Sequence, residues 1–175
     1  KTAFSIKTEL TTIQNTLDLL GKSCFLDKIN VPAISKAGSD QKSRCEKDAA
    51  YGNNGVFFCY DRYSIQSTKK VINKFLGRSP SEYLEQTLIH EMAHSYFWDN
   101  NPIVNLQHIT DWMKNTGYSL EISSAESPTI YGQSNFSEDF AESVRLYVTQ
   151  PQLLKESSQN RYYFLKQNVF CNYEY

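Results

Sequence analysis

The stretch LIHEMAHSYFWD, residues 88–99, holds two of the three histidines of the chain. His90 and His94 are four residues apart, and Glu91 directly follows the first of them. A helix turns by about 100° per residue, so positions i and i+4 lie on nearly the same face. If this stretch is helical, the two imidazoles project together. The sequence therefore predicts a metal site on one face of a helix.

The residues before this stretch favour a helix over about residues 80–98. Ser79 is expected to be the N-cap, Pro80 the first helical residue, and Glu82 the partner of Ser79 in a capping box. The side of this helix that faces away from the histidines is apolar and is expected in the core. It carries Leu88, Ile89, Met92, Ala93 and Tyr96.

Zinc suits such a histidine pair because it binds neutral imidazole nitrogens in tetrahedral geometry. His90 and His94 would lie roughly 40° apart around the helix, and Glu91 about 100° from His90. Glu91 would then stand beside the imidazoles, within reach of a water held there. The alternative is a pair of ordinary histidines on a helix face. A catalytic zinc needs a third protein ligand. Whether the chain offers such a ligand therefore decides between a metal site and an ordinary histidine pair.

The third histidine, His108, lies in a segment expected to form a helix from about 102 to 116 that ends at Gly117. We expect His108 to lie at the surface or to pack there rather than to bind the metal. A metzincin would carry its third histidine six residues after His94, and that position is Asn100. The sequence excludes that class.

The stretch SNFSEDFAESVRLYV, residues 134–148, offers a better third ligand. Glu138 and Glu142 share one side of an expected helix with Ser137 as its N-cap, and Arg145 lies next to them. Like charges at this spacing destabilise a helix by about 0.2–0.5 kcal/mol, which a bound cation would relieve. The alternative is a solvated acidic face with an intrahelical pair between Glu142 and Arg145. The expected core stripe is Phe140, Ala141, Val144, Tyr147 and Val148.

These two stretches resemble the gluzincin metallopeptidases of the anthrax lethal factor catalytic domain and the Pro-Pro endopeptidases. In that family the HExxH helix is followed by a second helix with a motif similar to E-x-F-A-E, which stands here as EDFAE, residues 138–142. The resemblance implies that Glu138 binds zinc and that Glu142 orients a ligand histidine. It also implies that Tyr131, seven residues before Glu138, stabilises the oxyanion. The alternative for Tyr131 is a tyrosine that packs in a loop.

The resemblance covers about residues 80–170 and is not complete. The family often has glycine before the second histidine and small or acidic residues after it, whereas this chain has Ala93 and then SYFWD, residues 95–99. A substrate preference is therefore not implied by the resemblance.

The ligand set His90, His94 and Glu138 implies a zinc-dependent endopeptidase with a single zinc ion per chain. Zinc would lower the pKa of its bound water to about 7. Glu91 would take the proton of that water and pass it to the leaving amine, and Tyr131 would stabilise the oxyanion. Two alternatives stay open: a catalytically inactive zincin-fold binding module, and a disulfide-stapled secreted interaction protein without metal.

Composition indicates one domain and no polyanionic partner. The chain has 175 residues, with 18 basic and 19 acidic side chains, so no attraction to nucleic acid is implied. The basic run Lys36–Lys47 is expected to be a solvated loop.

No apolar run approaches about 18 residues, so no membrane span is expected. The start at Lys1 without a signal-peptide pattern predicts a processed or trimmed chain. We expect a monomer that acts on a protein or peptide.

The four cysteines lack C-x-x-C spacing, which favours disulfides over a metal knuckle or buried thiols. Four cysteines allow about three pairings. An Asn-Gly turn signal followed by a β-run favours Cys45 with Cys59, which leaves Cys24 with Cys171. Disulfides imply an oxidising compartment, so the protein is expected to be secreted.

The remaining elements predict an α+β fold, mainly helical and zincin-like, with a small sheet in a single domain over residues 1–175. The segment 118–132 is expected to be a strand or irregular, and one or two short helices are expected through Phe170. VFFCYDRY, residues 56–63, is the candidate for the edge strand that aligns peptide substrates in zincins. The other expected elements are helices over about 3–21 and 66–76 and strands over 29–35 and 56–65.

Asn135-Phe136-Ser137 matches an N-glycosylation sequon directly before the expected ligand helix. A glycan at that place would crowd the cleft. We therefore expect either a source that does not glycosylate, such as a bacterium, or an unused sequon.

Overall fold

The computed structural model describes residues 6–31, 33–37, 49–52, 55–59, 79–97, 101–118 and 127–175. The α-helices are α1 (Ile6–Leu20), α3 (Pro80–His94), α4 (Pro102–Thr116), α5 (Phe136–Thr149), α6 (Pro151–Ser157) and α7 (Gln159–Phe164). The strands are β1 (Ile34–Ala37), β2 (Ala49–Gly52) and β3 (Gly55–Cys59). Short 3₁₀ turns are η1 (Phe25–Lys28), η3 (Ser95–Phe97) and η4 (Gly132–Ser134), and a π-helical turn, η5 (Leu165–Val169), follows α7.

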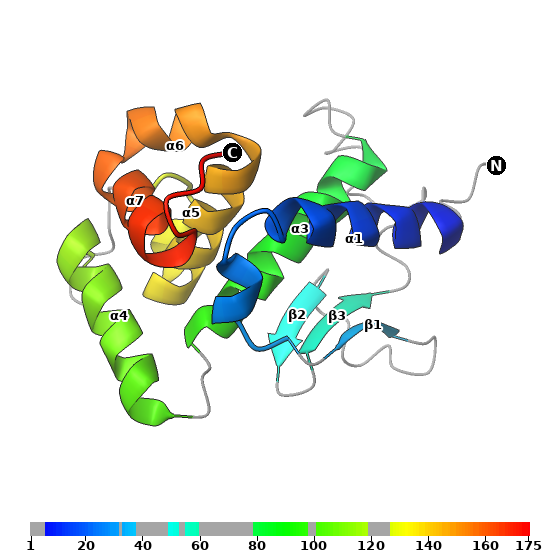
Figure 1. Cartoon of the computed structure of the whole chain (residues 1–175), viewed down its shortest axis with the longest axis horizontal. Coiled ribbons are helices and arrows are strands. Elements are labelled where there is room, and N and C mark those ends of the chain that lie inside the picture. Colours follow the sequence, from blue (N-terminus) through cyan, green and yellow to red (C-terminus); the bar gives the residue numbers. More distant parts are fainter. Residues whose placement is uncertain are drawn as a thin grey trace.

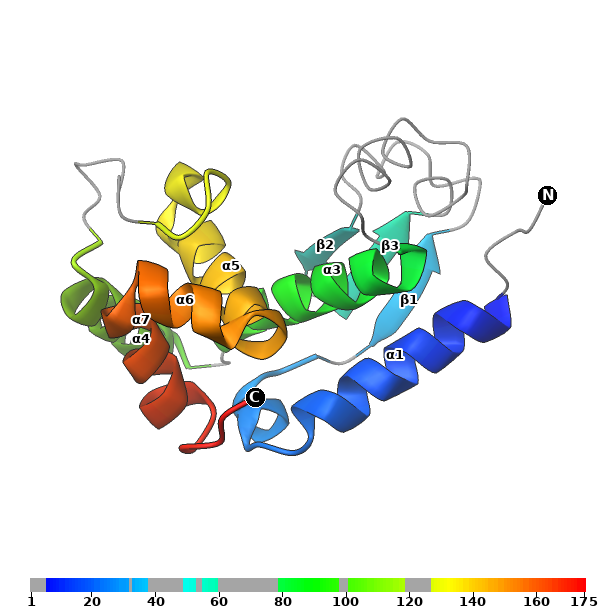
Figure 2. The ribbon, with the colours of Figure 1, turned by 90° about the horizontal axis from the view of Figure 1, so that it is seen from above.

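The helix α3 crosses the middle of the molecule (Figure 1). It lies beside α1 and α5 and against the strands β2 and β3. Figure 2 shows α1 running alongside α3 near the sheet, while α4 to α7 gather at the other end. The predicted mainly helical α+β class with a small sheet is confirmed. Within the described residues, no helix combines the length and apolarity that crossing a membrane requires.

The sheet has the order β1-β3-β2, with β1 parallel and β2 antiparallel to β3. The prediction that the stretch containing β3 is an edge strand is therefore wrong, because β3 has a neighbour on both sides. Gly55 permits this arrangement. It has a φ of 103°, and a Cβ there would overlap the carbonyl of Ala33. Val56 donates a backbone hydrogen bond to that carbonyl at 2.9 Å. Among the described strands, β1 and β2 form the edges.

The start of α3 is the predicted capping box. The hydroxyl of Ser79 accepts from the backbone N–H of Glu82 at 3.2 Å, and the Glu82 carboxylate accepts from the Ser79 N–H at 2.6 Å. The helix ends at His94, four residues before the predicted end, because the chain tightens into η3. There the hydroxyl of Ser95 donates to the carbonyl of Met92. The predicted core face is confirmed, since all its residues are buried: Leu88, Ile89, Met92, Ala93 and Tyr96.

The helix α5 starts at Phe136, and its N-cap is Asn135 rather than the predicted Ser137. The Asn135 Oδ1 accepts from the backbone N–H groups of Ser137 and Glu138, both at 3.0 Å. Asparagine caps as well as serine does, and it comes earlier in the chain. The predicted core stripe is confirmed by the burial of Phe140, Ala141, Val144, Tyr147 and Val148.

Phe140 packs α5 against η3, which follows α3, and against α4. Its ring centroid lies 5.0 Å from that of Tyr96, 4.6 Å from that of Phe97 and 5.0 Å from that of Trp112. Such aromatic pairs contribute about 0.5–1.5 kcal/mol beyond their buried area. Phe140 lies two residues after Glu138, so the same packing fixes the turn of α5 that carries Glu138.

The disulfide between Cys24 and Cys171 is confirmed, with a Cα–Cα distance of 5.9 Å. It ties the segment after α1 to the C-terminal segment, where the rings of Phe25 and Phe170 stack at 5.0 Å. The predicted pairing of Cys45 with Cys59 lies outside the described residues. So do the predicted helix over 66–76 and most of the run Lys36–Lys47.

The other described helices agree with the prediction in outline, whereas the strands agree only in part. The strand predicted over 29–35 overlaps β1 only at Ile34 and Ser35. The strand predicted over 56–65 overlaps β3 at 56–59, and residues 60–65 lie outside the described part of the chain.

The first predicted helix is described over Ile6–Leu20, and residues 3–5 of its predicted range lie outside the described residues. The helix predicted over about 102–116 is α4, which ends at Gly117 with a φ of 72°. The described part of the segment 118–132 contains irregular turns and the start of η4. Short helices follow α5 as expected. The single-domain prediction for the whole chain stays a prediction.

Candidate metal centre

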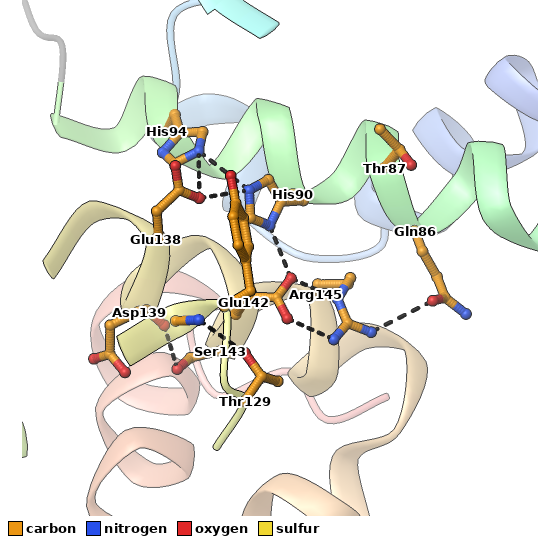
Figure 3. A network of polar contacts seen from close by, with 12 residues as sticks. Gln86, Thr87, His90, His94, Thr129, Glu138, Asp139, Glu142, Ser143 and Arg145 are labelled. Atoms are coloured by element: carbon orange, nitrogen blue, oxygen red, sulfur yellow. Dashed lines mark hydrogen bonds and ion pairs between the residues drawn. The ribbon is translucent and has the colours of Figure 1, made fainter. Parts of the chain in front are cut away.

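The helices α3 and α5 bring the three predicted ligands together (Figure 3). The Nε2 atoms of His90 and His94 lie 3.2 Å apart. An Oε2 atom of Glu138 lies 3.0 Å from the Nε2 of His90 and 3.5 Å from that of His94. Two segments far apart in the sequence thus direct two nitrogens and one carboxylate oxygen at the same point.

These separations fit the edges of a tetrahedral site. Metal–ligand bonds of about 2.0–2.2 Å in tetrahedral geometry place neighbouring ligand atoms about 3.3–3.6 Å apart. The three observed separations are 3.0, 3.2 and 3.5 Å. Modest side-chain adjustment therefore accommodates an ion, and the set of two imidazoles and one carboxylate matches the His₂Glu ligands of catalytic zinc sites.

The charges around His90 favour a cation at this point. Burial lowers the pKa of His90, but hydrogen bonds to Glu138 and Glu142 outweigh burial and raise it to about 9. Burial raises the pKa of Glu138 and Glu142 in turn. The hydrogen bonds that each makes with His90 hold the pKa of both carboxyl groups well below their ordinary value. In the metal-free chain a proton on His90 supplies the positive charge that a metal ion would replace.

Each histidine has a hydrogen-bond partner on the nitrogen that faces away from the site. The Nδ1 of His90 lies 3.0 Å from the Oε1 of Glu142, the role that the resemblance implies for that residue. The Nδ1 of His94 lies 2.8 Å from the Ser137 hydroxyl. Such partners fix the ring orientation and leave Nε2 free for a metal. The role of Ser137 was missed, because its position suggested a helix cap. Its place one residue before Glu138 was the available signal.

Tyr131 lies over the site, directly before η4. Its ring centroid is 5.7 Å from that of His90, and the residue is 51% exposed. Burial, followed by the charge of Glu138 and a hydrogen bond to it, raises the pKa of Tyr131 to about 12. The hydroxyl therefore stays protonated at neutral pH. The next residue, Gly132, lets the backbone lie close to Ser127 and to α5. A Cβ at Gly132 would overlap the hydroxyl of Ser127 and lie 3.3 Å from the Cα of Asp139.

Glu91 directly follows His90 on α3. Its side chain is half-buried, and its negative charge contributes to the raised pKa of both His90 and Tyr131. The structure thus brings the predicted base into the surroundings of the three ligands.

His108 lies outside the site, as expected. Its Nδ1 donates to the backbone carbonyl of Tyr96 at 2.9 Å, and its ring stacks on the Tyr96 ring at 4.2 Å. This histidine packs α4 against η3.

No protein-family model, curated protein or solved structure matches this chain. The gluzincin relationship therefore stays a prediction that rests on the two sequence motifs.

Proposed function

We propose that this chain is a secreted zinc-dependent endopeptidase. The observation that carries the proposal is the convergence of His90, His94 and Glu138, whose ligand atoms all lie within 4.8 Å of one another. Two further observations support it: the charge of Glu91 raises the pKa of His90, and the ring of Tyr131 lies 5.7 Å from that of His90. A carboxylate base and a hydroxyl donor near the ligands are what amide hydrolysis requires. The disulfide between Cys24 and Cys171 supports the secreted location, because disulfides persist in oxidising compartments.

Zinc fits the ligand set better than a hard cation does. Magnesium and calcium prefer shells made of oxygen, whereas zinc accepts imidazole nitrogens together with one carboxylate. When bound, zinc supplies Lewis acidity and lowers the pKa of a coordinated water toward about 7.

The protein side chains handle the protons and the developing charge. Glu91 accepts the proton of the attacking water and delivers it to the leaving amine. The hydroxyl of Tyr131 is protonated at neutral pH, because even the ordinary tyrosine pKa of 10.0 lies well above 7 and burial raises it here to about 12. It can therefore donate a hydrogen bond to the carbonyl oxygen as that atom gains negative charge. Glu142 and Ser137 hold the two imidazoles in place through their Nδ1 atoms.

The strand β2 replaces β3 as the candidate for aligning a peptide. Among the described strands β2 is an antiparallel edge, and it lies against α3, the helix that carries both histidines. An extended peptide that adds to this edge would gain backbone hydrogen bonds and run past α3.

The test combines cleavage profiling with a metal assay. The wild-type protein, incubated with a peptide library prepared from a proteome, should cleave at defined sequences, and a chelator should stop cleavage. Glu91→Gln should bind zinc as the wild type does and lose nearly all activity. Cleavage by this variant at the wild-type rate would refute the proposal.

Two other results would favour the alternatives. A zinc-loaded wild type without cleavage indicates an inactive zincin-fold binding module. A wild type that takes up no zinc indicates a disulfide-stapled interaction protein.

A further inference from the structure

Arg145 of α5 connects the two helices that form the metal centre (Figure 3). Its Nε donates to the Oε1 of Glu142 and its Nη2 to the Oε2 of Glu142, both at 2.9 Å. Its Nη1 lies 3.4 Å from the side-chain oxygen of Gln86 on α3. The side chains of Arg145 and Glu142 are 11% and 10% exposed, so this contact is largely shielded from water.

Glu142 Oε1 is a shared acceptor. It receives a hydrogen bond from the Nε of Arg145 and another from the Nδ1 of His90, at 2.9 and 3.0 Å. The terminal torsion of a glutamate is broad, so a carboxylate alone does not keep one plane. A guanidinium fork that binds both oxygens fixes that plane. The plane in turn decides whether Oε1 points at His90.

We propose that Arg145 is a positioning residue for the metal centre. It holds the Glu142 carboxylate so that His90 keeps its proton on Nδ1 and presents the Nε2 lone pair to the ion. Arg145 touches neither the ion nor the substrate. This inference rests on the proposed function, because it requires that His90 binds a metal.

Charge alone predicts the opposite effect. Arg145 is a cation paired with the carboxylate of Glu142, which in turn contacts His90, so removal of Arg145 makes the surroundings of His90 more negative. A more negative site attracts a divalent cation more strongly. If Arg145 acted only through its charge, its loss would tighten zinc binding. If it acts by position, its loss weakens binding, so the sign of the change separates the two accounts.

The test measures the zinc dissociation constant of the full chain by competition with a chromogenic chelator at fixed pH. Arg145→Met should weaken zinc binding by about 10–100-fold, the usual loss when a hydrogen-bond partner of a ligand is disturbed. Arg145→Lys keeps the charge but cannot bind both oxygens in a fixed plane, so its loss should be intermediate. Lys166→Met is the matched control. It removes a surface cation that pairs with Glu174 at 2.8 Å, and it should leave zinc binding unchanged.

A second readout separates positioning from general stability. Cobalt(II) replaces zinc in such sites, and its visible spectrum depends on the ligand geometry. The spectrum of Arg145→Lys should differ from that of the wild type, whereas that of Lys166→Met should not.

Unchanged or tighter zinc binding in Arg145→Met overturns the inference, as does an Arg145→Lys variant that matches the wild type in both affinity and spectrum. If Arg145→Met does not fold, the Arg145→Lys comparison alone decides. A wild type that binds no zinc would instead refute the proposed function, so the two failures are distinguishable.

Discussion

Glu138 and Asp139 are neighbours on α5, yet they face two different environments. Glu138 points to the histidines of α3, with a side chain that is 13% exposed. Asp139 is fully buried on another side of the helix. There it accepts from the Nε of Arg161 at 3.1 Å and from the indole N–H of Trp112 at 3.0 Å. Successive helical residues point about 100° apart, so one turn of helix serves both purposes.

The comparison separates a carboxylate used for binding from one used for anchoring. The ion pair of Asp139 joins α5 to α7 and, through Trp112, to α4. Glu138 instead directs its Oε2 at the Nε2 atoms of His90 and His94, at 3.0 and 3.5 Å. A site of this kind needs both a binding carboxylate and an anchoring carboxylate, because a mobile helix would not keep Glu138 within reach of two imidazoles.

The largest loss of stability is expected when the ion pair between Asp139 and Arg161, the anchor of α5, is broken. Asp139→Asn leaves the buried guanidinium of Arg161 without its counter-charge, which costs about 3–5 kcal/mol of unfolding free energy. Urea unfolding of the metal-free protein measures this loss. The double variant Asp139→Leu with Arg161→Met replaces both charges by apolar groups and should recover most of it. A single variant as stable as the wild type would show that the pair does not anchor α5.

The pH dependence of the stability of the metal-free protein tests the contact between Glu138 and the histidines. The pKa of His90 in the folded chain is about 9, above its ordinary value of 6.5, so its contribution is fully present below about pH 6.5 and is lost as the pH rises through 9. Its size is on the order of 3 kcal/mol. The free-energy difference between wild type and His90→Gln should therefore shrink between about pH 6.5 and 9. A difference that stays constant over this range contradicts the assignment.

The lowered pKa values of Glu138 and Glu142 affect stability at a lower pH than that of His90 does. Their contribution to stability is present above the ordinary glutamate pKa of 4.5 and is lost as the pH falls from there through the lowered pKa values. These carboxylates and His90 share the same contacts, so their contributions describe one interaction and do not add.

A smaller effect is expected from zinc itself. Zinc at about 100 times its dissociation constant should stabilise the wild type by about 2.7 kcal/mol, which raises the melting temperature by roughly 5–10 °C. Glu138→Gln should abolish this shift, because it removes one of the three proposed ligands. A folded anchor variant, such as the Asp139 and Arg161 double variant, should keep it. Equal shifts in Glu138→Gln and wild type would exclude Glu138 as a ligand.

The sequence predicted the elements of the site that follow local rules. The capping box at Ser79, the apolar faces of α3 and α5 and the stop at Gly117 all depend on side chains within a few residues of one another. The convergence of the two histidines with Glu138 was expected from the resemblance. Helical periodicity then ensured that each ligand faced away from its own apolar stripe.

The features that sequence reasoning missed depend on the tertiary arrangement. Nothing local distinguishes Ser137 as a helix cap from Ser137 as a partner of His94, because α3 must lie beside it first. β3 was misplaced at the edge because the short strand β2 was not recognised as its neighbour. The anchor of Asp139 likewise needs Arg161, which lies 22 residues further along the chain.

The central claim is that His90, His94 and Glu138 hold a single zinc ion. The most direct measurement is elemental analysis of the purified wild type beside His94→Gln, combined with X-ray absorption at the zinc edge. We expect about one zinc per wild-type chain, bound to two imidazoles and oxygen ligands, and a large loss in the variant. Wild-type protein that contains no stoichiometric zinc after incubation with the metal, or equal zinc in both proteins, would contradict the claim.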